Sequence, residues 1–190
     1  MKKISLFFLL VAASFAGFSQ NVWKADKAHT QIKFDITHLG VSTVSGAYTD
    51  FDVNITSAKE DFSDAVFNLS IKAESINTGV QQRDTHLKSA DFFDVATYPT
   101  ITFKSTGIKK VSDGKYKLTG NLTIHGITKP VTMDLWYRGT IANPMTKKPD
   151  AGFRLTGALK RSDFEVGGKF PAAMLSEEVT ITADGEFAQG

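Results

Sequence analysis

The side chains best suited to metal or acid–base chemistry in this chain are its four histidines, His29, His38, His86 and His125. No two of them have the short spacing of a zinc motif, and the chain contains no cysteine. His29 and His38 flank one expected strand, so other ligands can meet them in space. Hydrogen-bonded structural histidines are nevertheless the more common outcome. We therefore expect no metal site and no cofactor.

Residue patterns for covalent catalysis are not present in the sequence either. There is no GxSxG nucleophile elbow and no glycine-rich phosphate loop. Asp84, His86 and Ser89 are close in sequence, but helical residues two apart do not face each other. We expect a protein that is not an enzyme. The other acidic candidates are best interpreted as solvated loop charges: Asp91, Asp94, Asp163 and Glu165.

Two arginines are better candidates for ligand contact. Arg83 precedes Asp84, and Arg161 lies two residues before Asp163. An arginine at a cavity mouth can hold a phosphate or carboxylate head group through two parallel hydrogen bonds. The competing interpretation, which we favour, is an ion pair with the neighbouring acid that ties a loop to the rest of the fold.

These side chains must be positioned by β-strands. Apolar and polar residues alternate along most of the chain after residue 20, as in strands with one buried face. The turn Ser112-Asp113-Gly114 predicts a hairpin, and about eight strands would close a barrel with room for one ligand. The alternating segments lie within residues 32–36, 51–55, 65–74, 101–103, 116–124, 131–137, 153–159 and 179–187.

One segment, residues 75–94, breaks the alternation and predicts a short helix. Thr78 and Gln81 have the spacing of a capping box, which predicts a helix over about residues 79–88 with Thr78 as its N-cap. Phe92 and Phe93 follow as apolar anchors. The helix would either plug one end of a barrel or gate a ligand entrance. Periodicity alone favours a filled core over a cavity for the buried face of the strands.

The N-terminus predicts export. Lys2 and Lys3 precede an apolar stretch and then small residues, which is the pattern of a secretory signal peptide over residues 1–19. Cleavage after Ser19 or after Ala16 fits the small-residue rule. We expect one domain over residues 20–190 in the periplasm, with an extracellular location as the alternative, and no stable membrane insertion after cleavage.

The charge balance argues against nucleic acid as a partner. The chain has 22 Lys and Arg against 20 Asp and Glu, and Lys2 and Lys3 account for the whole difference. A near-neutral mature chain lacks the basic footprint of a nucleic-acid-binding protein.

Several separated motifs resemble the YceI-like family of polyisoprenoid-binding proteins. The most specific is residues 83–94, RDTHLKSADFFD, followed by Tyr98-Pro99 and Phe103. The chain departs from the family pattern at Glu165, where glycine is expected. The other matching segments are Trp23–Asp26, His29–Phe34, Thr37-His38, Gly46, Ser75–Gly79, Gly120–Val131 and Arg161–Phe164.

The resemblance implies an all-β fold, an extended antiparallel eight-stranded lipocalin-like barrel with a helical insertion around residues 79–90. It also implies a non-catalytic carrier or storage protein, a monomer or homodimer, that holds an isoprenoid or other long-chain lipid in its lumen. Two alternatives remain: a stress-related structural or interaction protein with a filled barrel, and an enzyme acting on a lipid at the barrel mouth. The expected rim or head-group residues are His38, Arg83, His86 and Arg161. The expected lumen residues are Ile32, Phe34, Phe67, Leu69, Ile71, Phe103, Leu122, Ile124, Leu135, Phe153 and Leu155.

Overall fold

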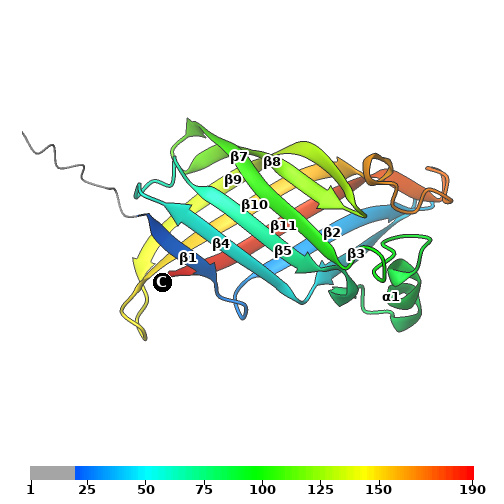
Figure 1. Ribbon diagram of the computed structural model, residues 1–190, viewed down its shortest axis with the longest axis horizontal. Coiled ribbons are helices and arrows are strands. Elements are labelled where there is room, and N and C mark those ends of the chain that lie inside the picture. Colours follow the sequence, from blue (N-terminus) through cyan, green and yellow to red (C-terminus); the bar gives the residue numbers. More distant parts are fainter. Residues whose placement is uncertain (1–19) are drawn as a thin grey trace, which may run out of the picture.

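An antiparallel sheet closed into a barrel dominates the computed structural model, which describes residues 20–190 (Figure 1). The expected signal peptide, residues 1–19, lies outside the described residues. The expected eight-stranded lipocalin-like barrel is confirmed. In order around the barrel, its strands are β1 (Asn21–Ala25), β4 (Phe51–Ser57), β5 (Val66–Lys72), β7 (Thr100–Ser112), β8 (Lys115–Ile124), β9 (Ile127–Ala142), β10 (Pro149–Lys160) and β11 (Leu175–Gln189).

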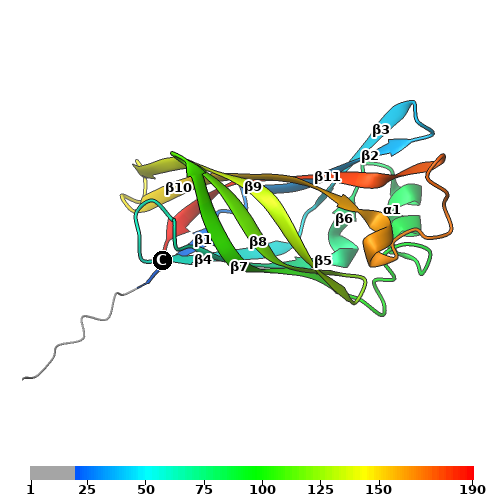
Figure 2. The ribbon, with the colours of Figure 1, turned by 90° about the horizontal axis from the view of Figure 1, so that it is seen from above.

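The long strand β11 closes the barrel by pairing with two strands along one edge. Its C-terminal part, Phe187 to Gln189, pairs with β1. Its N-terminal part pairs with β2 (Gln31–His38), which pairs in turn with β3 (Ser42–Tyr48). The β2–β3 hairpin projects from the barrel end that carries the helix α1 (Figure 2). A two-residue strand, β6 (Ile76–Asn77), pairs with the end of β3.

Alternation of side chains sets which residues face the interior. In β8, Tyr116, Leu118 and Leu122 are buried, whereas Lys115 and Lys117 are exposed. Successive side chains on a strand point to opposite faces, so this pattern places every second residue inside. The expected hairpin also forms, because Ser112 at the end of β7 pairs with Lys115 at the start of β8 around Gly114, whose φ is +66°.

An aromatic cluster fills the barrel at the end opposite α1. Phe62, in the β4–β5 loop, is only 1% exposed and adopts a left-handed φ of +58°. Its ring centroid lies 5.1 Å from that of Trp23 and 4.9 Å from those of Tyr137 and Phe153. The carbonyl of the preceding residue accepts a hydrogen bond from the Tyr116 hydroxyl, which holds the loop in place. Phe62 therefore acts as a plug of this end.

The helix α1 spans Gln81–Lys88, as expected within the insertion, but the expected capping box is wrong. Val80 occupies the N-cap position, no side chain caps it, and its own side chain is 48% exposed. The Asp84 carboxylate instead accepts hydrogen bonds from the backbone and hydroxyl of Thr78, which orders the chain before the helix.

Two single-turn 3-10 helices cover Ala73–Ser75 (η1) and Arg161–Phe164 (η2). Within residues 20–190, no helix is long and apolar enough to cross a bilayer.

The aromatic plug predicts a large stability loss on truncation. Replacing Phe62 with Ala would leave a cavity among rings that cannot close over it, and should reduce the free energy of unfolding by about 3–5 kcal/mol. Urea unfolding monitored by fluorescence measures this. Met145→Ala, at a side chain that is 90% exposed, is the control and should change stability by less than about 0.5 kcal/mol. Similar small losses in both variants would contradict the plug.

Candidate functional site: an apolar cavity beside the helix

A cavity of about 410 Å³ lies in the barrel toward the α1 end. Its walls are inward-facing apolar side chains, and Phe92 and Phe93 line it from the segment after α1. Eight of the eleven expected lumen residues lie in its wall: Ile32, Phe34, Leu69, Ile71, Phe103, Leu122, Ile124 and Leu155. The barrel is thus neither filled throughout nor hollow throughout.

The other three expected lumen residues lie outside this cavity. The rings of Phe67 and Phe153 lie 5.7 Å apart, and Phe153 also packs against the Phe62 plug. Leu135 is buried opposite Tyr116 in the neighbouring strand. Phe67 and Phe153 each lie two residues from a lining residue of the same strand, Leu69 and Leu155, on the side of the plug. Leu135 pairs with Leu155 across the neighbouring strands. These three side chains belong to the packed part of the interior.

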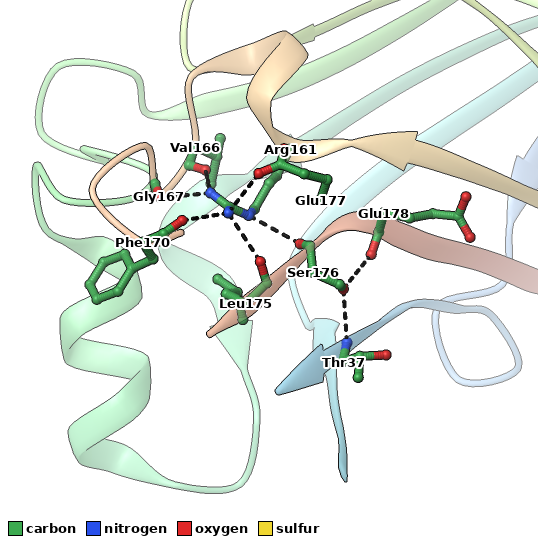
Figure 3. Close-up of polar contacts among 9 residues, drawn as sticks. All are labelled: Thr37, Arg161, Val166, Gly167, Phe170, Leu175, Ser176, Glu177 and Glu178. Carbon is green, nitrogen blue, oxygen red and sulfur yellow. Dashed lines mark hydrogen bonds and ion pairs between the residues drawn. The ribbon is translucent and has the colours of Figure 1, made fainter. Parts of the chain in front are cut away.

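Arg161 is the most heavily bonded side chain at the cavity (Figure 3). It is 5% exposed, and its five N–H groups donate to six acceptors, because one of the two Nη2 hydrogens is shared between two of them. Five are backbone carbonyl oxygens, and the sixth is the Glu177 carboxylate at 2.8 Å. The carbonyls belong to Val166, Gly167, Phe170, Leu175 and Ser176, at 2.6–3.3 Å. The expected ion pair between Arg161 and Asp163 is wrong, because Arg161 pairs with Glu177.

The loop that Arg161 holds, residues 165–174, has an irregular backbone at both ends. Glu165 adopts a left-handed φ of +56°, a conformation that glycine adopts without strain, so the expected glycine position is explained. The β2–β11 register shifts between Leu175 and Val179, and this bulge brings Glu177 to the guanidinium. The Ser176 hydroxyl bridges the bulge by accepting from the Thr37 amide and donating to the Glu178 carbonyl (Figure 3).

The same loop is joined to the segment that follows α1. Lys169 forms an ion pair with Asp91. The rings of Phe92 and Phe170 stack with centroids 4.9 Å apart, and His86 packs edge-on against both. The Lys169 ammonium and, next, His86 hold the pKa of the Asp91 carboxyl below its ordinary range. Two segments distant in sequence therefore meet at the cavity mouth.

Arg83 lies at the mouth in a different environment. Its side chain is half-buried and lines the cavity. The Nε donates to the Thr78 hydroxyl at 2.7 Å and one Nη2 hydrogen to the Thr78 carbonyl at 3.1 Å. The expected ion pair with Asp84 is wrong, because that carboxylate accepts from Thr78 instead.

The four histidines are not brought together. His38 and His86 line the cavity. His29 lies at the β1–β2 corner, where its Nδ1 is 2.9 Å from Asp26 and 3.9 Å from Glu186. This trio, in which Asp26 is partly buried and the other two are exposed, is the one group of potential metal ligands within residues 20–190. His125 lies in the β8–β9 turn and packs edge-on against Tyr98 at 4.5 Å.

Some residues of the cavity wall escaped the sequence analysis. Three further wall residues carry a sequence signal. Phe92 and Phe93 are the expected anchors, and Phe164 ends the Arg161–Phe164 motif. The remainder carry no pattern that would separate them from ordinary core residues. The additional lining residues include Tyr48, Leu87, Met133, Leu159, Phe170, Met174 and Leu175.

The fold and the site together define a closed, lipocalin-like β-barrel with an internal apolar cavity beside a short helix. The model of the YceI-like domain matches residues 23–187, and the chain belongs to this family. It is 37% identical to Protein YceI of Salmonella arizonae over 189 residues, covering 97% of this chain and 98% of that protein.

Solved structures share the fold. The Campylobacter jejuni YceI protein matches with a TM-score of 0.72 and 28% identity, covering 98% of this chain and 99% of that one. A polyisoprenoid-binding domain from Saccharophagus degradans matches with a TM-score of 0.68 and 14% identity, covering 90% of this chain and all of that one, 100%. At that identity, the second comparison speaks for the fold alone.

The Arg161 network predicts that even lysine is a poor substitute. Lysine has three donors in place of five, so Arg161→Lys would leave buried carbonyls without a partner and should reduce the free energy of unfolding by about 3 kcal/mol or more. The control is Arg154→Lys in β10, the strand that leads to Arg161. Its ion pair with Asp184 is exposed, so the substitution should change stability by less than about 1 kcal/mol. Equal effects in urea unfolding would contradict a structural role for Arg161.

The ion pair at the mouth predicts a specific titration. The pKa of Asp91 should lie below 3.8, its ordinary value, and Lys169→Met should raise it. Because the folded state lowers this pKa, its contribution to stability is present above the ordinary value and is lost as pH falls through the folded value. Carboxyl carbon NMR measures both. An Asp91 pKa that is unchanged by Lys169→Met would exclude the ion pair in solution.

Proposed function

We propose that the protein binds a long-chain amphiphilic lipid of the polyisoprenoid type in its cavity and acts as a periplasmic carrier or store for it. The observation that carries this proposal is the apolar cavity beside α1, inside a barrel whose other end is plugged. A second support is that a polyisoprenoid-binding domain shares the fold. The eight expected lumen residues that line the cavity become the proposed contacts with the chain, and His38, Arg83 and His86 become the proposed contacts with the head group.

Burial of hydrocarbon provides the affinity in this proposal. Each methylene that leaves water contributes about 0.8 kcal/mol, so a long chain binds tightly with few polar contacts. Apolar walls discriminate poorly between similar chains, because they present no polar group that a slightly different chain would leave unpaired. The protein should therefore accept several chains of suitable length.

The aromatic cluster limits how deep such a chain reaches. Phe67 and Phe153 lie next to the wall residues Leu69 and Leu155 on the same strands, at the plugged side of the cavity. They belong to the packed part of the interior, so a bound chain would end before it reaches them. The volume of about 410 Å³ is near the lower end of the range of about 300–1,000 Å³ for small-molecule sites, so part of a very long chain would remain outside.

The location in the periplasm rests on the sequence of residues 1–19, with its basic start, apolar stretch and small residues before Gln20. An extracellular location is the alternative for the same signal. Mass spectrometry of the N-terminus of protein recovered from the periplasm and from the medium of its own host tests both the cleavage and the destination.

The binding proposal predicts that filling the cavity abolishes ligand uptake. Ala183, in β11, lines the cavity, and a Trp there would occupy the space of several methylenes. Native mass spectrometry and titration with farnesol and geranylgeraniol should detect bound lipid in the unmodified protein. Ala183→Trp should weaken binding at least about tenfold, since displacing two methylenes already costs about 1.6 kcal/mol.

The matched control for this substitution is Ala158→Trp. Ala158 is exposed on β10, one position from residues that face inward, so its side chain is outside the cavity. It should leave the affinity unchanged. A protein that takes up neither lipid, or one whose binding is unaffected by Ala183→Trp, would refute the proposed function.

A further inference from the structure

Arg83 is a cation at the cavity mouth whose hydrogen-bonding capacity is largely unused within residues 20–190. Two of its five N–H groups bond to Thr78, through Nε and Nη2. Both hydrogens on Nη1 and one on Nη2 have no acceptor in the described chain, and no carboxylate there lies within 4 Å of the guanidinium. Two of these three hydrogens, one on Nη1 and one on Nη2, lie on the Nη1–Nη2 edge, which can donate two parallel hydrogen bonds to the oxygens of one anion.

The position of this edge is fixed by its neighbours. The Thr78 hydroxyl donates to Asp84 at 2.6 Å, so its lone pair is free to accept from Arg83 Nε. The Asp84 carboxylate accepts two hydrogen bonds from Thr78 and, among the described ion pairs, forms none with Arg83. Asp84 follows Arg83 in the sequence, but in the fold its carboxylate binds Thr78.

The charge of the cavity wall has one sign. Of the described residues that line the cavity, none is Asp or Glu, whereas Arg83 and Arg161 line it together with the cations Lys33 and Lys160. Arg161 has no donor to spare, because carbonyls and Glu177 accept from all three of its nitrogens. Arg83 is therefore the arginine at the mouth that is able to bind a ligand group.

We propose that the ligand is an amphiphile whose apolar chain ends in an anionic oxygen group, a carboxylate or a phosphate, held by the Nη1–Nη2 edge of Arg83. The inference rests on the proposed function and adds the class of head group. A neutral hydroxyl would use one of the three free hydrogens. An anion satisfies the edge and compensates the charge beside apolar walls, where electrostatic interactions are stronger than in water.

The experiment compares head groups on one tail. Farnesol, farnesoic acid and farnesyl phosphate share a chain and differ in charge, and calorimetry gives their affinities at one pH and salt concentration. With the unmodified protein, the acid or the phosphate should bind at least about tenfold more tightly than the alcohol. The ratio between acid and phosphate distinguishes a carboxylate from a phosphate as the preferred source of the anionic group.

The variant Arg83→Gln should bring the three affinities close together. Its matched control is Arg138→Gln, which removes the same charge from an exposed ion pair with Asp184 and should preserve the preference for anions. Equal affinity for alcohol, acid and phosphate in the unmodified protein would overturn the inference and leave lipid binding intact. A preference that persists in Arg83→Gln would overturn the role of Arg83. Failure of all three to bind would refute the proposed function itself.

Discussion

The buried guanidinium of Arg161 is the interaction on which the mouth of this barrel depends. A charge removed from water is tolerated only where hydrogen bonds and an opposite charge replace its hydration. Here the replacement consists mostly of backbone carbonyls from residues 166–176, which must converge on one point. That requirement fixes the path of the loop, and the left-handed Glu165 and the bulge before Val179 follow from it.

The loop position determines what meets at the mouth. Phe170 is placed against Phe92 and His86, and Lys169 against Asp91, so the loop and the segment after α1 enclose the cavity together. The opposite end uses a different device, in which one loop inserts Phe62 among the rings of its neighbours. The same closed sheet therefore has a packed half for stability and a hollow half for a ligand.

Much of the barrel could be predicted because bulky residues alternate along its longer strands. The prediction missed β1, β3 and the two-residue strand β6, where this signal is weak. β1 buries only Trp23, and β3 consists mostly of small residues. Gly46 in β3 faces Phe34, and an added Cβ would lie 2.3 Å from that ring, so a large partner explains the small residue. A pattern of single residues does not reveal such a pair.

The interior could be predicted less well than the strands. Alternation identifies which side chains face the interior. It does not show which of them pack against a side chain from a loop and which face a cavity. Phe67, Leu135 and Phe153 have the same pattern as Leu69 and Leu155, and what separates them is the Phe62 plug, which arrives from an irregular loop. The depth of the cavity is thus a tertiary property.

The two arginines show the same limit for the polar part of the site. Each has an acid within two residues in the sequence, and each was expected to pair with it. In the structure neither does, because the backbone turns Asp84 toward Thr78 and the neighbouring strand β11 supplies Glu177. One guanidinium is consumed by the fold, and the other retains a free edge at the apolar mouth. Which arginine is structural and which is available to a ligand follows from this topology, and the residue type alone does not distinguish them.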